Sequence, residues 1–192
     1  MVIGEQMFRK IKQWPAACLR ADNLEVENVS EVKDIIRDLI DTCNVKMGAG
    51  LAAPQIGINK KIVIIKPAAF GQENPDPSEY NEKYMVIINP TLENSGDEIK
   101  WKESCLSLEG ITSSVLRQSQ TMLTYTDEAG DTQKMVADWP FSGGLQHECD
   151  HLDGKLFIHH MKRNKRSFLL ERRRKKLKKI ARAEKKAKRA LK

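Results

Sequence analysis

Apolar residues recur at helical spacing in one segment near the N-terminus, residues 32–47. They stand three or four positions apart, on one face of an α-helix, and they are Val32, Ile35, Ile36, Leu39, Ile40, Cys43 and Met47. Ser30 stands where an N-cap is expected, and Gly48 follows as a stop. We therefore predict an N-terminal helix whose apolar face, Cys43 included, belongs to the core.

Short runs rich in β-branched and aromatic residues mark the middle of the chain. They predict strands at residues 61–65, 84–88, 98–102, 121–125 and 132–136. The last two runs flank the turn sequence of residues 127–130, so we expect them to form a hairpin. At least five strands, antiparallel in part, are thus expected before the next helix.

That next helix is predicted to start near Asp138 as its cap, with Pro140 in the first turn, and to stop at Gly154. Gly143 and Gly144 lie inside it, although glycine costs about 1 kcal/mol relative to alanine in a helix. Their lack of a side chain is expected to leave room for a neighbouring strand or for a substrate side chain.

The same helix carries the sequence QHECDH at residues 146–151. At about 100° per residue, His147 and His151 lie one turn apart on one face, so both imidazoles can bind a single metal ion. Glu148 sits beside that face, where its carboxylate can act on a water molecule without being a ligand. Cys149 is about 200° around from His147 and is expected to point away.

Residues 162–192 differ in charge from the rest of the chain. They hold 17 Lys and Arg against two Glu, whereas residues 1–161 hold 16 Lys and Arg against 24 Asp and Glu. A thin apolar stripe runs through the basic segment: Leu170, Leu177, Ile180, Ala187 and Leu191. We predict a body of residues 1–161 and a basic helical extension of residues 162–192, capped by Asn164 or Ser167, that contacts a polyanion. The alternative is a solvated or partly disordered extension, because like charges one turn apart repel.

Composition favours a cytoplasmic protein. The first 22 residues lack the apolar centre of a secretory signal, and no run approaches the ~18 apolar residues of a membrane helix. Four widely spaced cysteines in such a chain do not indicate a disulfide framework. We therefore expect reduced thiols and no membrane partner.

Two histidines leave a metal ion short of protein ligands. Downstream, His159 and His160 are adjacent to each other, and Glu171 lies in a basic run, so they fit poorly. Upstream, Cys105 follows a predicted strand, where a loop could present its thiolate to the two histidines. An inert buried thiol is the usual alternative for a cysteine, but one Cys and two His with an open fourth position suit a catalytic metal.

Three blocks of the sequence together resemble the peptide deformylase family. They are GAGLAAPQ at residues 48–55, ESCLS at residues 103–107 and QHECDH at residues 146–151, in the family's order. The resemblance implies a compact α+β fold, with the metal-binding helix packed among small antiparallel β-sheets. It also implies the reaction: hydrolysis of the N-terminal formyl group from formyl-methionyl nascent polypeptides, acting co-translationally.

The resemblance also implies a set of roles. Cys105, His147 and His151 would hold one divalent metal ion, with Fe²⁺ as the native ion and Ni²⁺, Co²⁺ or Zn²⁺ as substitutes; the donor types alone do not separate these metals. Glu148 would be the general acid and base. In bacterial members a C-terminal helix docks on the ribosome, so rRNA is the expected partner of the basic extension.

Two further groups would bind the formyl oxygen: the side-chain amide of Gln55 and the backbone N–H of Leu106. We expect the substrate pocket to be lined by Ala49, Gly50, Glu103 and Gly144. Ser104, Glu109 and Ala49 depart from the family's pattern, which bears on the shape of the loop and of the pocket.

Two other functions are compatible with parts of the sequence. A metallopeptidase could use the same helix, and an RNA-binding protein could retain an inactive enzyme body. Asp150 could be merely solvated, or it could pair with Arg117 behind the site.

Overall fold

A single antiparallel sheet organises the part of the chain that the computed structural model describes, residues 8–72 and 83–190. Its strand order follows the sequence. The strands are β1 (Gly50–Ala52), β2 (Ile62–Ile65), β3 (Met85–Ser104), β4 (Thr112–Thr126) and β5 (Thr132–Asp138). The α+β class is confirmed, but the strands form one five-stranded sheet and not several small ones.

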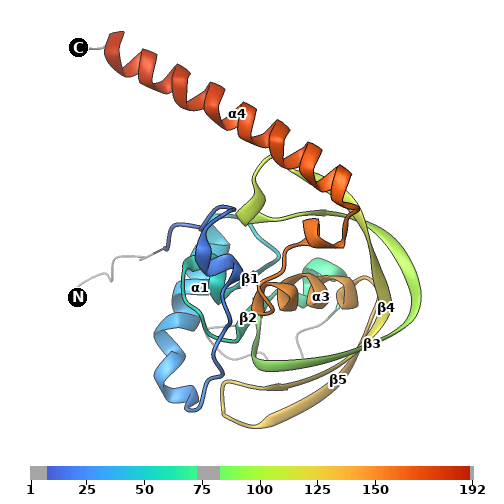
Figure 1. Ribbon diagram of the computed structural model, residues 1–192. Coiled ribbons are helices and arrows are strands. Elements are labelled where there is room, and N and C mark those ends of the chain that lie inside the picture. The colour runs from blue at the N-terminus through green and yellow to red at the C-terminus, as the bar shows by residue number, and fades with distance from the viewer. Residues whose placement is uncertain (1–7, 73–82, 191–192) are drawn as a thin grey trace, which may run out of the picture.

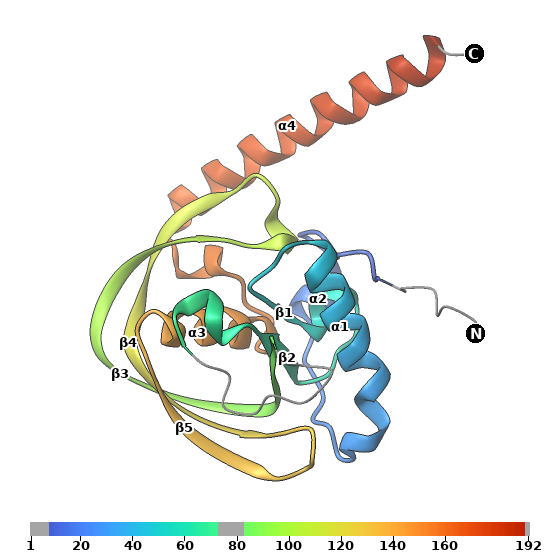
Figure 2. The ribbon, with the colours of Figure 1, turned by 180° about the vertical axis from the view of Figure 1, so that it is seen from behind.

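Strands β3 and β4 are long and curve around helix α3 (Phe141–Leu152), as Figures 1 and 2 show. The register between them shifts twice, between Ile88 and Thr91 and again between Ser95 and Glu98. Asn89 and Gly96 have φ angles of 50° and 79° at these irregularities, and an inserted residue bends a strand. The runs predicted at 84–88 and 98–102 are therefore two parts of the one bent strand β3. The three-residue strand β1 was not predicted from the sequence.

Helix α1 (Lys33–Val45) precedes the strands in the sequence, α2 (Ala53–Ile56) lies between β1 and β2, and α3 and α4 (Arg163–Ala190) follow β5. The longer helices are α1, α3 and α4, and α2 is one short turn. The 3₁₀ turns are η1 (Ala17–Arg20), η2 (Val29–Val32), η3 (Pro67–Phe70), η4 (Leu106–Leu108) and η5 (Phe157–His160).

The predicted helix ends were wrong in detail. Asn28, and not Ser30, is the N-cap: its side chain accepts a hydrogen bond from the Ser30 N–H at 3.0 Å. This cap belongs to the 3₁₀ turn η2, which precedes α1. Asp138 ends β5, so α3 starts after Pro140 without a side-chain cap. Helix α4 begins at Arg163, before both of the caps predicted for it at residues 164 and 167. Tertiary packing decides these boundaries more than local propensity does.

Three apolar clusters hold the body together. The first joins the apolar face of α1, with Cys43 fully buried as predicted, to β1 and β2. The prediction was wrong for Met47, which is 90% exposed because α1 ends at Val45 and the chain then turns away. The second packs α3 into the concave side of the sheet, where it contacts all five strands. The third joins the N-terminal segment to η4 and η5, and Leu169 and Leu170 of α4 pack against it.

Helix α4 passes over the loop between β3 and β4 and extends well beyond the body (Figures 1 and 2). The division into residues 1–161 and 162–192 stays a prediction, because the first turns of α4 pack against the third cluster. Among the described residues, no helix combines the length and the apolar character needed to cross a membrane.

Candidate active site

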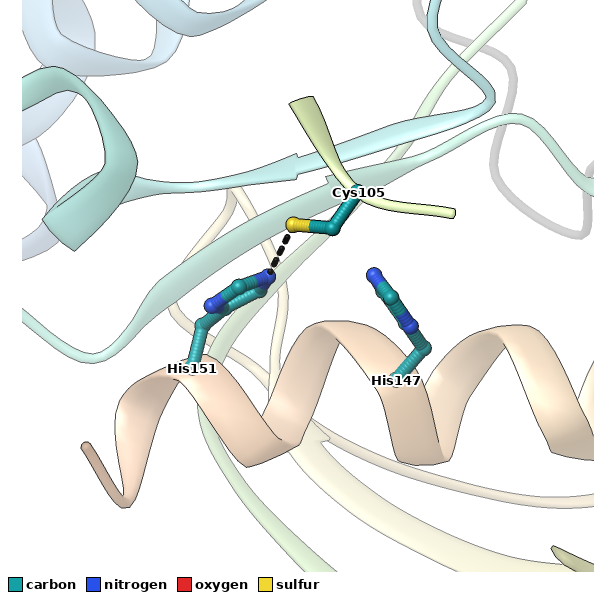
Figure 3. A group of neighbouring side chains, drawn as sticks. All are labelled: Cys105, His147 and His151. Atoms are coloured by element: carbon teal, nitrogen blue, oxygen red, sulfur yellow. Dashed lines mark hydrogen bonds between the residues drawn. The ribbon is translucent and has the colours of Figure 1, made fainter. Parts of the chain in front are cut away.

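Helix α3 and the end of β3 bring together three side chains that could hold a metal ion. His147 and His151 project from one side of α3 toward Cys105, which follows β3 directly (Figure 3). One ligand atom from each residue lies within 4.8 Å of the other two, and Cys105 Sγ is 3.3 Å from His151 Nε2. Sequence reasoning named the same three residues.

The environment of Cys105 favours the thiolate. Burial alone would raise the pKa of the Cys105 thiol, but the positive potential and hydrogen bonds of His151 and His147 outweigh burial and lower it to about 5. A soft thiolate beside two imidazoles suits a transition-metal ion or zinc. The residues present therefore fit one divalent metal ion.

A buried acidic side chain orients one of the histidines. Glu103 Oε2 lies 2.5 Å from His147 Nδ1, which leaves Nε2 of that ring to face the ligand cluster. Arg117 donates to the same carboxylate, from Nε to Oε1 at 2.7 Å and from Nη2 to Oε2 at 3.1 Å. Hydrogen bonds of this kind fix the ring orientation of metal-binding histidines. Both oxygens of the Glu103 carboxylate are thus engaged inside the protein.

The hypothesised pairing of Asp150 with Arg117 is confirmed. Arg117 Nη1 donates to Asp150 Oδ2 at 2.7 Å, and His160 Nε2 lies 2.6 Å from the same oxygen. His159 instead accepts a hydrogen bond at Nδ1 from the Leu156 N–H. Neither His159 nor His160 joins the ligand cluster. Arg117 thus connects two acids. Burial acts to raise the pKa of both carboxyls, but His147 and Arg117 lower the pKa of Glu103, and His160 and Arg117 lower that of Asp150.

Glu148 is buried beside the cluster. Its Oε2 atom has no hydrogen-bond partner among the described residues. Burial raises the pKa of the Glu148 carboxyl to about 6, against the opposing effect of the two histidines. Gly50 gives it space, because a Cβ atom on Gly50 would lie 2.7 Å from Glu148 Oε1. A base with a pKa near neutrality suits proton transfer in both directions.

Gln55 approaches the cluster from α2. Its Oε1 accepts a hydrogen bond from the Ala52 N–H at 2.8 Å, which fixes the amide so that Nε2 faces Cys105 Sγ at 3.5 Å and Ser107 Oγ at 3.3 Å. Leu106 opens η4 directly after Cys105, and its carbonyl accepts from Gln13 Nε2 at 2.7 Å. The contacts from Gln13 and Ser107 were not foreseen, since both depend on tertiary packing.

A cleft of about 440 Å³ opens onto this cluster. All four residues predicted to line a substrate pocket, Ala49, Gly50, Glu103 and Gly144, line it. Two aromatic side chains that sequence reasoning missed also line it: Phe70 of η3 and Trp101 of β3.

The aromatic rings of Trp101 and Phe70 occupy the space beside Gly143 and Gly144 of α3. A Cβ atom on Gly144 would lie 2.6 Å from Phe70, and one on Gly143 would collide with Trp101. The prediction that the glycines admit a neighbouring strand is met at Gly143, by a side chain of β3. At Gly144 the neighbour comes from η3.

Cys149 points away from the cluster, as predicted. It lines a separate polar cavity of about 370 Å³ together with Arg117 and Asp150.

Comparison with known proteins gives one consistent result. The family described as "Polypeptide deformylase" matches residues 8–167. Peptide deformylase 2 of Prochlorococcus marinus is 35% identical over 142 residues, which cover 73% of this chain and 67% of that relative. The peptide deformylase of Thermodesulfovibrio yellowstonii is 34% identical over 153 residues, 78% of this chain and 86% of that one.

Solved structures agree. A peptide deformylase from Legionella pneumophila superposes with a TM-score of 0.79 at 30% identity, covering 92% of this chain and 99% of that one. A probable peptide deformylase from Synechococcus phage S-SSM7 gives a TM-score of 0.70 at 29% identity, covering 80% and 99%. Sequence match, fold and cleft all lead to one conclusion: the chain belongs to the polypeptide deformylase family.

Proposed function

We propose that this chain removes the N-terminal formyl group from formyl-methionyl nascent polypeptides by metal-dependent hydrolysis. One observation carries the proposal: the thiol of Cys105 and the imidazoles of His147 and His151 converge where Cys105 and His147 line a cleft, beside the buried carboxylate of Glu148. Family membership supplies the reaction class, hydrolysis of a formyl amide.

Cys105, His147 and His151 would hold the metal ion, for which we propose Fe²⁺. When bound, a divalent ion supplies a Lewis acid that makes water nucleophilic at neutral pH. Glu103 holds the His147 ring in place through Nδ1, and the hydrogen bonds from His147 and Arg117 outweigh burial and lower the pKa of the Glu103 carboxyl.

Glu148 moves the protons. With a pKa of about 6 its carboxylate is mostly ionised at pH 7, so it can accept a proton from the attacking water. The protonated carboxyl can then donate to the nitrogen of the leaving methionine amine. General acid–base help of this kind is typically worth ~10²–10⁴-fold in rate.

The formyl oxygen gains negative charge during attack. We propose that Gln55 Nε2 and the Leu106 N–H donate to it, because Gln55 is buried and its amide is already oriented by Ala52. Fixed donors of this kind favour the charged state over the neutral carbonyl, and losing one typically costs ~10²–10³ in turnover.

The test is formate release from formyl-Met-Ala-Ser by protein purified without air, with metal analysis of the same sample. Wild type is expected to release formate and leave the peptide bonds intact, and E148Q is expected to retain metal with greatly reduced turnover. Cleavage of an internal peptide bond would favour the metallopeptidase alternative. Activity at background level, equal in wild type and E148Q, would favour the inactive RNA-binding alternative.

We also propose that the enzyme acts in the cytoplasm as chains emerge, with the exposed cations of α4 on rRNA. The support is electrostatic. Residues 162–192 carry 17 cations, and the release of counterions from RNA raises the binding affinity of such a segment. Co-sedimentation with ribosomes should weaken steeply as salt rises. Binding that does not depend on salt would contradict this partner.

A further inference from the structure

A second hollow adjoins the active-site cleft. It has a volume of about 280 Å³ and lies between α4 and the loop that joins η4 to β4. Its walls are Glu109, Gly110, Arg173, Lys176, Leu177 and Ile180. Glu109 and Gly110 also line the active-site cleft, so the two hollows meet at these two residues. We call the second hollow the α4 groove.

The wall contributed by α4 is fixed in place at Arg173. This side chain is buried, and it donates to the Glu109 carbonyl at 3.0 Å, the Trp14 carbonyl at 3.1 Å and Gln13 Oε1 at 2.7 Å. Three acceptors from two separate segments hold the guanidinium. The helix therefore has a set position over the loop that joins β3 to β4 (Figure 1).

Beyond Arg173, the same helical face is apolar and uncovered. Leu177 and Ile180 stand four and seven residues after Arg173, and they remain 41% and 44% exposed. Lys176 flanks them, with its Nζ atom 3.9 Å from the position that a Cβ on Gly110 would occupy. The α4 groove thus offers two apolar side chains and one ammonium group beside the point where it meets the cleft.

A nascent chain threaded into the cleft by its N-terminus must leave it across the rim. The α4 groove is continuous with the cleft at Glu109 and Gly110, so it offers an exit lined with binding groups. The Lys176 ammonium beside Gly110 favours an acidic side chain at this end of the groove, and the negative charge of Glu109 in the same wall partly offsets that preference.

We propose that the α4 groove binds downstream residues of the formylated peptide, taking an apolar side chain against Leu177 and Ile180 and an acidic side chain beside Lys176. This inference rests on the proposed deformylase activity and adds a substrate preference to it. Peptides long enough to reach α4 then have a higher kcat/KM than short ones.

The experiment compares three free peptides that share the start formyl-Met-Ala-Ser. One is the tripeptide, one is extended to eight residues with Leu and Asp in the last five, and one is extended with Ser and Lys. For wild type we expect the Leu/Asp peptide to have a kcat/KM about threefold to tenfold above the tripeptide, which corresponds to one or two partly buried contacts. The Ser/Lys peptide should gain nothing.

Two variants locate the effect. L177S/I180S should abolish the gain of the Leu/Asp peptide while leaving the tripeptide unchanged. K176E should lower kcat/KM for the Leu/Asp peptide and raise it for the Ser/Lys peptide. K178E is the matched control, because residue 178 lies about 200° around the helix from residue 176 and outside the groove. It should change neither peptide.

The outcomes separate the two proposals. Formate release from the tripeptide with no gain from length would overturn the groove and leave the deformylase proposal standing. No release from any peptide would overturn the deformylase proposal itself. Equal effects of K176E and K178E would mean that the preference among peptides comes from the overall charge of the helix. That result would overturn the proposal of a specific binding groove.

Discussion

At the scale of single residues, a buried ion network lies behind the side chains that we propose as metal ligands. Glu103 and Arg117 are almost fully buried, and each has its charge balanced by hydrogen-bonded partners. Burying unpaired charges is costly, so removing one member leaves the others uncompensated. The network therefore couples the orientation of His147 to residues that never reach the cluster.

The E103Q variant tests this coupling. Both oxygens of the Glu103 carboxylate accept hydrogen bonds, whereas the NH₂ group of glutamine can only donate. Glutamine therefore cannot serve Arg117 and His147 together, and the His147 ring loses its fixed orientation. We expect metal affinity to fall about 10-fold to 100-fold, as for other residues that orient metal-binding histidines. Competition with a chelator measures it. E98Q, at an exposed position of the same strand, is the matched control. Equal metal affinity in E103Q and wild type would contradict an orienting role.

The G50A variant tests the space around Glu148. The added Cβ would lie 2.7 Å from Glu148 Oε1, so the carboxylate must move. Small displacements of a reacting group are costly, and we expect kcat to fall about 10-fold to 100-fold with metal content unchanged. Formate release and elemental analysis measure the two quantities. A G50A enzyme with wild-type kcat would mean that Glu148 can shift without consequence.

The two histidines of the proposed metal site could be predicted because they stand four residues apart in the sequence, which is about one helical turn. His147 and His151 must share a face of any helix that contains them. The engagement of Glu103 could not be predicted this way, because its partners Arg117 and His147 come from β4 and α3. Phe70 and Trp101 were missed for the same reason: no local pattern marks an aromatic ring that packs on a distant glycine.

At the scale of elements, the turn of the β4–β5 hairpin is stabilised by the side chain of Asp127. Asp127 Oδ1 accepts from the N–H groups of Ala129 and Asp131, each at 2.9 Å, and Oδ2 accepts from Gln133 Nε2 at 2.7 Å. The hairpin was predicted from its turn sequence alone. The length of β3 was not, because the bulges at Ile88/Thr91 and Ser95/Glu98 interrupt its alternation.

The D127N variant should weaken that hairpin in a pH-dependent way. Burial acts to raise the pKa of the Asp127 carboxyl, but the hydrogen bonds outweigh it and the pKa is lowered. A carboxyl with a depressed folded-state pKa stabilises the fold above its unfolded-state pKa, about 4, and this stability is lost as pH falls through the folded-state value. We expect D127N to cost about 1–3 kcal/mol at pH 7 and less at pH 3.

Urea unfolding at both pH values measures the difference. D131N is the control, because the Asp131 side chain is exposed in the same turn. The same loss for D127N at pH 7 and pH 3 would show that its charge does not matter.

At the scale of the whole molecule, α4 combines two regions with different surroundings. Its first part contributes Leu169, Leu170 and the buried Arg173 to the body, whereas its C-terminal part extends away from the body (Figure 2). Charge composition predicted a boundary near residue 162 from the sequence. The charge composition shows where cations are concentrated in the sequence. The position of α4 on the body is instead set by the contacts of Leu169, Leu170 and Arg173.

Two truncations should therefore behave differently. Deleting residues 181–192 removes only the projecting part, so we expect the Tm to stay within a degree or two and tripeptide deformylation to be unchanged. Deleting residues 164–192 also removes Leu169, Leu170 and the three hydrogen bonds of Arg173. The third core cluster then loses its cover, and we expect the Tm to fall by about 5–10 °C. Differential scanning calorimetry measures both. Equal Tm values for the two truncations would show that the docked turns of α4 add nothing to the fold, and the helix would then be an independent appendage along its whole length.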